Sequence, residues 1–412
     1  MQSKYFLIGL IAVSVACTSK KIDYASLPDD KLMRVADSLA QVYVLADGHV
    51  DLPYRLRVNR FRLEKQFMGI PIRSDEGDFD YERAKKGGLD VPFMSIYIPT
   101  GEQQPGVAKK LADSLINMVD GIIREHPDKF AQAGTPDEAI ANTRAGKLSL
   151  PYGMENGAPI ENDLKNVKYF YDRGVRYITL SHSKNNQICD SSGDTTQLWN
   201  GLSPFGVEVV KEMNRVGIMV DISHVHDSTF YQVMKLTKVP CIASHSSCRA
   251  FAPTVKRDMT DDMIKKMGEN GGVIMINFYN AFLDSAVVNQ NDRNRKKLQA
   301  LLAEKKLSAT DSLARPIIAQ FEKDNPSLKT DVKIVANHID HVVKIAGIDH
   351  VGIGSDYDGV DGDLPTGLED VSKYPNLIFE LLKRGYTPDD IEKICSKNVF
   401  RVWNAVIEAS EN

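Results

Sequence analysis

A histidine and an aspartate stand two positions apart at the end of an early apolar segment. His49 and Asp51 follow the apolar run 42–46 and the dipeptide Asp47-Gly48. In a β-strand, residues i and i+2 point to the same side, so an imidazole and a carboxylate can bind one ion from a single strand end. A lone His-x-Asp pair is more often a hydrogen-bonded surface pair. The metal interpretation therefore depends on whether similar residues recur along the chain.

Five further apolar segments run directly into a residue that can bind a metal or exchange a proton. These segments are 148–154, 175–181, 217–223, 240–244 and 351–355, and the residues that follow them are Glu155, His182, His224, His245 and Asp356. Two similar segments, 91–98 and 272–277, end in less reactive side chains. Together with 42–46 they make eight predicted strands. Amphipathic stretches between them predict helices at 106–126, 160–173, 204–216 and 261–270.

This alternation indicates an α/β fold with a closed sheet. Strands that are apolar throughout and are separated by helices predict a parallel sheet buried on both faces. Eight of them predict a (β/α)8 TIM barrel, whose reactive residues lie at the carboxyl ends of the strands. A doubly wound open sheet is the structural alternative, but it would place its ligands at one switch point. Reactive residues at six separate strand ends favour the barrel.

A single catalytic domain at 41–408 accounts for most of the chain, after a leader and first helix at 18–40. The 412 residues, 42% of them hydrophobic, exceed the roughly 250 of a plain barrel, which predicts an insertion. We place a helical insertion between the last two strands, at about 283–332. Its charged run 289–297 favours a solvated helical excursion over a partner site. A net charge of −4 gives no electrostatic footprint for nucleic acid.

Residues 1–17 have the pattern of an export signal. Lys4 precedes the apolar run 5–15, which is too short to span a bilayer comfortably and ends in small residues before Cys17. The stretch 14–17 resembles a bacterial lipoprotein signal, in which Cys17 would be lipidated and start the mature chain, although Ser14 replaces the usual branched aliphatic residue. An ordinary signal peptide cut nearby is the alternative. Both interpretations predict an exported protein of the bacterial cell envelope, with a lipid anchor as its membrane contact.

The residues at the strand ends predict a metal centre with two ions. Neutral imidazoles and carboxylates suit zinc, and a catalytic zinc keeps one position open for water. Three histidines, one aspartate and one glutamate are too many ligands for one open tetrahedral site. They fit two ions that share a carboxylate. The remaining cysteines show no metal or disulfide spacing, and Cys248 has no nearby partners for a nucleophile.

The motifs around these residues occur in the order seen in a known enzyme family. They are Asp47-Gly48-His49-Val50-Asp51, Gly153-Met154-Glu155-Asn156-Gly157, Leu180-Ser181-His182-Ser183, Asp221-Ile222-Ser223-His224, Ser244-His245-Ser246-Ser247 and Gly352-Ile353-Gly354-Ser355-Asp356-Tyr357-Asp358-Gly359. The chain resembles the membrane (renal) dipeptidases, which are binuclear zinc metallopeptidases of the amidohydrolase barrel type. The resemblance continues through 367–375 and 398–403 and covers about residues 40–408.

The resemblance implies a ligand set for two zinc ions. His49 and Asp51 would hold the first ion, and His224 and His245 would hold the second. Glu155 would bridge the two ions together with a hydroxide.

The resemblance also implies roles in substrate binding and catalysis. His182 would contact the substrate beside the metals, and Asp356 would handle the proton. Arg257 would receive the terminal carboxylate of the substrate, and Tyr279 would contact the substrate. The stretch between His245 and Arg257 varies in length within the family, so Lys256 is a rival for the carboxylate role.

Several other polar residues have less reactive interpretations. His226 follows His224 at i+2 and is expected to support the metal site from outside or to cap a helix. Asp358 lies at i+2 from Asp356 and is expected to brace the loop rather than to share the proton. The remaining histidines are expected to be ordinary surface or packing residues or to end a helix; they are His126, His338, His341 and His350.

The activity implied is hydrolysis of dipeptides that carry a free terminal carboxylate, by attack of the metal-bridging hydroxide on the peptide carbonyl. A related amidohydrolase that acts on N-acyl amino acids or cyclic amides is one alternative. A non-catalytic peptide-binding lipoprotein is another, although binding alone needs no acid-base residue beside a metal. The partner is in each case a small molecule, and a homodimer is compatible with the sequence.

Overall fold

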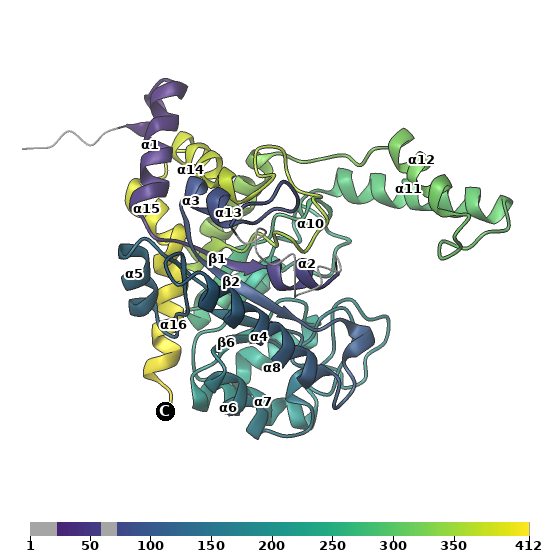
Figure 1. Ribbon diagram of the computed structural model, residues 1–412, viewed down its shortest axis with the longest axis horizontal. Coiled ribbons are helices and arrows are strands. Elements are labelled where there is room, and N and C mark those ends of the chain that lie inside the picture. Colours follow the sequence, from purple (N-terminus) through teal and green to yellow (C-terminus); the bar gives the residue numbers. More distant parts are fainter. Residues whose placement is uncertain (1–22, 59–71, 412) are drawn as a thin grey trace, which may run out of the picture.

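The computed structural model describes residues 23–58 and 72–411 (Figure 1). The predicted export signal and the lipidated Cys17 lie outside these ranges and remain predictions from the sequence. Within the described ranges, none of the helices combines the length and the apolar character needed to cross a bilayer.

Eight parallel strands of the described residues form one sheet that closes into a barrel. In spatial order they are β1 (Leu45–Val50), β2 (Leu89–Tyr97), β5 (Tyr152–Glu155), β6 (Val175–Thr179), β7 (Met219–Asp221), β8 (Ile242–Ser246), β9 (Val273–Ile276) and β10 (Val351–Ile353). Two backbone hydrogen bonds join the end of β1 to the segment that follows β10. Asp356 N–H donates to the His49 carbonyl at 3.1 Å, and Asp51 N–H donates to the Tyr357 carbonyl at 2.8 Å. The predicted (β/α)8 barrel is confirmed.

Helices cover the outside of this sheet (Figure 1). They are α1 (Asp29–Val42), α2 (Leu52–Val58), α3 (Tyr81–Gly87), α4 (Ala108–Glu125), α5 (Pro136–Arg144), α6 (Lys165–Asp172), α7 (Pro204–Val216), α8 (Asp227–Leu236), α9 (Asp261–Asn270), α13 (Val332–Ala346), α14 (Tyr374–Lys383), α15 (Pro388–Glu392) and α16 (Asn398–Glu408). The four helices predicted between strands match α4, α6, α7 and α9. The bounds of α7 and α9 were predictable because each has a hydroxyl N-cap, Ser203 or Thr260, and a left-handed glycine at its end, Gly217 or Gly271.

The first predicted strand is displaced. The run 42–46 was expected to be extended, but α1 continues through Val42, whose side chain is 71% exposed, and β1 begins only at Leu45. The polar residues Asp47 and His49, which the sequence places after the strand, belong to β1 and are buried. The pattern of hydrophobicity placed the start and end of β1 too early, because the side chains buried at this end of the barrel are polar.

The segment 148–154 was predicted as one strand and is two. Leu148–Ser149 forms β4, which pairs with β3 (Phe130–Ala131) in a separate two-stranded sheet. Only Tyr152–Glu155 belongs to the barrel. Pro151 lies between the two strands, and proline has no N–H to donate to a ladder, so it interrupts the pairing.

The predicted helical insertion between the last two strands is present. It contains α10 (Asn280–Leu283), α11 (Ser285–Glu304) and α12 (Arg315–Asp324). Figure 1 shows α11 and α12 projecting away from the barrel. Only Val287 and Leu302 of α11, and no residue of α12, are buried. The charged run 289–297 lies within α11, as expected for a solvated helix.

Candidate active site

The reactive residues meet at the carboxyl end of the barrel. His49 and His245 lie within β1 and β8, and Glu155 is the last residue of β5. Each of the other three lies three residues past the end of its strand; they are His182, His224 and Asp356. Most of these side chains line a cavity of about 240 Å³, together with Asp51, Tyr279 and several aromatic residues. The predicted strand ends thus converge on one site.

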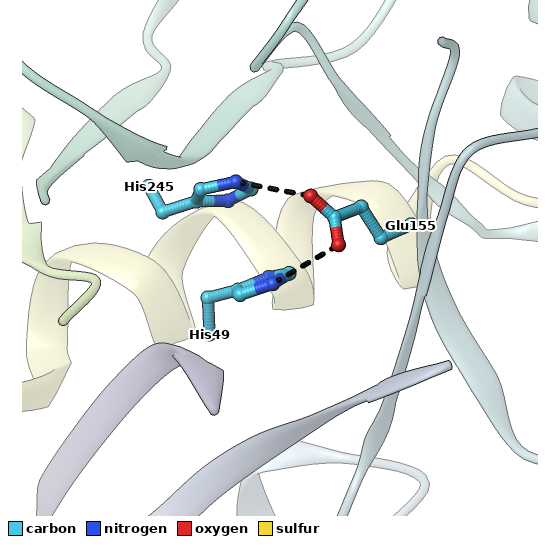
Figure 2. Close-up of side chains that lie close together, drawn as sticks. All are labelled: His49, Glu155 and His245. Carbon is cyan, nitrogen blue, oxygen red and sulfur yellow. Dashed lines mark ion pairs between the residues drawn. The ribbon is translucent and has the colours of Figure 1, made fainter. Parts of the chain in front are cut away.

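The carboxylate of Glu155 is the centre of the cluster. Its Oε1 lies 3.0 Å from His224 Nε2 and 3.3 Å from His245 Nε2. Its Oε2 lies 3.5 Å from His49 Nε2. Figure 2 shows the rings of His49 and His245 facing the two different oxygens of this carboxylate. One carboxylate therefore contacts imidazoles from three other strands.

The donor atoms form three groups that could each hold a cation. Within each group they lie within 4.8 Å of one another, and the groups are His49/Glu155/His245, Glu155/His182/His224 and His49/Asp51/Asp356. Two of the groups share Glu155, which is the arrangement expected of a bridging carboxylate. His49 Nε2 and Asp51 Oδ1 are buried without a hydrogen-bond partner, and such atoms are costly unless another group binds them. The donor set therefore fits metal ions.

Tyr177 fixes the tautomer of His49. The Tyr177 hydroxyl donates to the Gly48 carbonyl at 2.9 Å, so at 2.8 Å it can only accept from Nδ1–H of His49. The Nε2 lone pair of His49 then faces the cluster, as metal binding requires. The ring of Tyr177 occupies the space beside Gly153, where a Cβ would lie 1.9 Å from Tyr177 Cζ. Glycine at position 153 is needed for this reason.

Ser244 orients His245 in the same way. Ser244 Oγ donates to Asp221 Oδ2 at 2.6 Å and lies 2.8 Å from His245 Nδ1. Since its one proton is directed at the carboxylate, the hydroxyl accepts from Nδ1–H, and Nε2 of His245 carries a lone pair. This Nε2 lies 2.9 Å from Nε2 of His224. A proton or a cation must lie between two nitrogens held this close.

The electrostatics match the protonation states that metal binding needs. Burial raises the pKa of Glu155, but His49 and His182 outweigh it, and the pKa is lowered well below its usual range. Burial lowers the pKa of His245 to about 3 and that of His224 well below its usual range. Glu155 is thus an anion and these two imidazoles are neutral, the forms that bind metals.

His49 differs in its electrostatics. Burial acts against its protonation, but Tyr177, Asp51 and Glu155 outweigh burial and raise its pKa well above the usual range. Surroundings that stabilise a positive charge on this ring also stabilise a metal cation beside it.

Asp356 has the surroundings of a group that exchanges protons. Burial raises its pKa, while His245 and His49 oppose the increase. Its Oδ1 lies 4.0 Å from His49 Nε2, and its Oδ2 accepts a hydrogen bond from Asn277 at 2.8 Å. Its backbone is left-handed, with φ of 67°, and so is that of His224. Such conformations are held at functional sites by the structure around them.

Arg257 lies beside the cavity, and Lys256 does not. The Arg257 guanidinium donates to Ser246 Oγ at 2.7 Å and to the His245 carbonyl at 2.5 Å, and its Nε is buried without a partner. Its carbon lies 5.7 Å from the ring centre of Phe282, which lines the cavity. Lys256 is exposed on the surface.

Other predicted residues lie outside the cluster. His226 is the N-cap of α8 and accepts from the Ser228 N–H at 3.2 Å, as expected of a capping residue. Asp358 pairs with Arg55 at 2.8 Å and accepts from the Asp78 N–H at 2.6 Å, so it braces the loop. The described cysteines are all buried free thiols, namely Cys189, Cys241, Cys248 and Cys395.

The sequence did not single out several residues of the site. Tyr97 and Tyr54 line the cavity, and the Tyr97 ring packs edge-on against His182 at 4.7 Å and against Tyr54 at 4.9 Å. Tyr97 is the last residue of β2, and Asn277 follows β9 directly; these are the two strands without a metal-binding side chain at their ends. Their positions at strand ends were the available signal. A search for side chains that bind metals or exchange protons does not select tyrosine or asparagine.

The chain matches a known peptidase family over most of its length. A model of the membrane dipeptidases, peptidase family M19, matches residues 33–412. The chain belongs to this family. It is a metallodipeptidase, and dipeptidase verJ of Clonostachys rogersoniana is 34% identical to it over 395 residues, covering 93% of this chain and 89% of that one.

Two solved peptidase structures share the fold. The crystal structure of the probable dipeptidase PvdM from Pseudomonas aeruginosa superposes with a TM-score of 0.78 at 26% identity, covering 92% of this chain and 99% of that one. A metallopeptidase from Rhodobacter sphaeroides, liganded with a phosphinate mimic of L-Ala-D-Ala, gives 0.70 at 24% identity and covers 88% and 99%. At that identity the second likeness supports the fold alone.

Proposed function

We propose that this metallodipeptidase cleaves dipeptides with a free terminal carboxylate by means of two zinc ions that share Glu155. The observation that carries the proposal is the position of the Glu155 carboxylate, with imidazole nitrogens of three other strands 3.0 to 3.5 Å from its two oxygens. A single mononuclear site would not need one carboxylate between two sets of histidines. The orphaned Nε2 of His49 supports the same conclusion.

We assign the ligands to the two ions by the Glu155 oxygen that each imidazole faces, which is Oε2 for His49 and Oε1 for His224 and His245. His49 and Asp51, on β1 and just after it, would hold one ion, and His224 and His245 would hold the other, with Glu155 shared. Zinc held by these residues would act as a Lewis acid and would lower the pKa of its bound water to about 7. A fourth imidazole close to Glu155, that of His182 with its Nε2 3.6 Å from Oε1, remains for the substrate.

His182 is arranged to donate a hydrogen bond to the substrate. The hydroxyl of Ser183 lies 2.8 Å from His182 Nδ1, and the hydroxyl of Tyr97 lies 3.4 Å from the same atom. Either hydroxyl can donate to Nδ1, which leaves the proton on Nε2. Burial lowers the pKa of His182, so the ring is a neutral donor. A fixed donor of this kind stabilises the negative charge that develops on the peptide carbonyl oxygen.

Asp356 moves the proton in this proposal. Its carboxylate accepts the proton of the attacking water and returns it to the nitrogen of the leaving amine, so that the peptide bond is broken without release of an amide anion. Such general acid-base catalysis contributes about 10²- to 10⁴-fold. The raised pKa of Asp356 suits a group that must both accept and donate the proton.

Arg257 and the small cavity select short substrates. The cavity volume is about 240 Å³, and the guanidinium beside it matches a carboxylate in charge and geometry. A peptide whose terminal carboxylate pairs with Arg257 places its last peptide bond near the metal ligands. Longer chains would have to extend out of the cavity.

Hydrolysis assays with and without a chelator separate this proposal from its alternatives. We expect the purified protein to hydrolyse several dipeptides, to lose this activity after removal of metal, and to regain it when zinc is added. Faster hydrolysis of N-acyl amino acids or cyclic amides than of dipeptides would favour the broader amidohydrolase. Binding of dipeptides without turnover in the metal-loaded protein would contradict the enzymatic proposal.

A further inference from the structure

The side-chain amide of Asn277 joins two groups of the proposed reaction. Asn277 follows β9 directly and is fully buried. Its Nδ2 donates to Asp356 Oδ2 at 2.8 Å, and its Oδ1 accepts from the backbone N–H of Tyr279 at 2.5 Å. One amide therefore connects the carboxylate that handles the proton with the backbone of a tyrosine that lines the cavity.

The orientation of this amide is fixed by chemistry. A backbone N–H can only donate, so the atom that faces Tyr279 N must be the amide oxygen. The amide nitrogen then necessarily faces Asp356. The backbone of Asn277 is also held, because its N–H donates to the Ser246 carbonyl at 3.3 Å and its carbonyl accepts from Ser247 Oγ at 3.3 Å. Asn277 presents its donor to Asp356 from a rigid support.

This contact makes the two oxygens of Asp356 different. Oδ2 is engaged by Asn277, whereas Oδ1 lies 4.0 Å from His49 Nε2, on the side of the metal ligands. The close approach of Gly359 restricts the carboxylate further, since a Cβ at that glycine would lie 2.7 Å from Oδ1. A carboxyl that rotates freely would present either oxygen to the substrate. Asp356 cannot do so without breaking the bond to Asn277.

We propose that Asn277 is a positioning residue that reserves Asp356 Oδ1 for proton exchange and fixes Tyr279 at the cavity wall. This inference rests on the proposed dipeptidase function. Within the part of the chain that the structure describes, the side chain of Asn277 is hydrogen-bonded to Asp356 and to the backbone of Tyr279, and to none of the proposed metal ligands. Its effect passes through Asp356 on one side and through Tyr279 on the other, so the two effects can be separated by substitution.

Asn277→Asp separates the two contacts. The aspartate has the size of asparagine and still accepts from Tyr279 N–H. It replaces the amide donor to Asp356 with a second carboxyl, and two carboxyls this close share one proton, so Asp356 is no longer free to exchange its own. We expect kcat to fall by about tenfold or more, because a misplaced catalytic group is costly. KM should stay within about twofold of the parent value. Asn277→Ala removes both contacts and should lower kcat and raise KM together.

The matched control is Asn280→Asp. Asn280 is a second buried asparagine that donates to an aspartate, Asp363 Oδ1 at 2.9 Å, and the hydrogen bonds of its side chain among the described residues go to Asp363 and Thr330 rather than to the catalytic cluster. Asn280→Asp makes the same change from an amide to a carboxyl, at another buried position. We expect Asn280→Asp to keep kcat within about twofold, which separates loss of position from a general cost of burying a carboxyl. Metal content and the unfolding temperature are measured for each variant.

Coupling to Asp356 gives the decisive readout. In an Asp356→Asn background the proton exchange is already lost, so Asn277→Asp should lower kcat by less than about threefold further. An equal loss in both backgrounds would overturn the inference, and so would a kcat within twofold of the parent in Asn277→Asp alone. Loss of bound metal from Asn277→Asp and Asn277→Ala alike would assign Asn277 a structural role instead. A parent protein that hydrolyses no dipeptide would refute the proposed function and this inference with it.

Discussion

Asp356→Asn should fold, keep its metals and lose turnover by about 10²- to 10⁴-fold. The amide has the shape of the carboxylate but cannot carry the proton from the attacking water to the leaving nitrogen. Steady-state kinetics on a dipeptide give kcat, and metal analysis of the same sample shows that the centre is intact. Equal kcat in the variant and the parent would remove Asp356 from the proton transfer.

Asp361→Asn is the matched control for this substitution. Asp361 lies on the same loop, is exposed, and has a left-handed backbone with φ of 51°, close to the 67° of Asp356. Asparagine tolerates this conformation well. The control therefore makes the same chemical change in the same backbone region without touching the metal ligands. We expect its kcat to stay within about twofold of the parent.

Amidation of the dipeptide should lower kcat/KM by about 30-fold or more. The amide loses the charge-assisted contact with Arg257 and leaves a partly buried guanidinium without this partner. Breaking such a pair costs about 2 to 5 kcal/mol, and about 2 kcal/mol corresponds to 30-fold. Arg257→Ala should show the same deficit on the free dipeptide and little further loss on the amide, because the partner is already absent.

Lys256→Ala is the control for the proposed pairing of Arg257 with the terminal carboxylate of the substrate, which we call the carboxylate clamp. Its side chain is exposed, so its removal should leave kcat/KM on free dipeptides unchanged within about twofold. Comparable rates of the parent enzyme on free and amidated dipeptides would contradict the clamp and favour a broader amidohydrolase. If kcat/KM on free dipeptides fell in Lys256→Ala and not in Arg257→Ala, the carboxylate would still be bound by a basic residue, but that residue would be Lys256.

The sequence predicted the barrel because its strands are buried on both faces and therefore apolar throughout. The prediction from hydrophobicity was wrong where a buried strand is not apolar throughout. In β1 the polar side chains of Asp47 and His49 are buried at the barrel end, so the pattern of hydrophobicity placed the strand too early. At Pro151 a continuous apolar run hides an interruption that depends on the missing N–H. Local pattern alone did not separate β4 from β5.

The metal-ligand candidates were predictable because ligand-type residues at strand ends meet in any barrel. The residues that orient these ligands could not be predicted in this way. Tyr177 contacts His49 across 128 positions of the chain, and its role depends on the closure of the barrel and on the space left by Gly153. The choice between Arg257 and Lys256 depended on the conformation of a loop. Such contacts between distant or irregular segments carry no signal in the pattern of one sequence.

Counting the metals bound with and without Glu155 tests the central claim most directly. The metal-free protein is titrated with zinc, and bound metal and dipeptide hydrolysis are followed together. The account predicts that the parent binds two ions and reaches full activity only with the second, and that Glu155→Ala binds at most one and is inactive. A Glu155→Ala protein that still holds two ions, or a parent that is fully active with one, would contradict a centre built around this carboxylate.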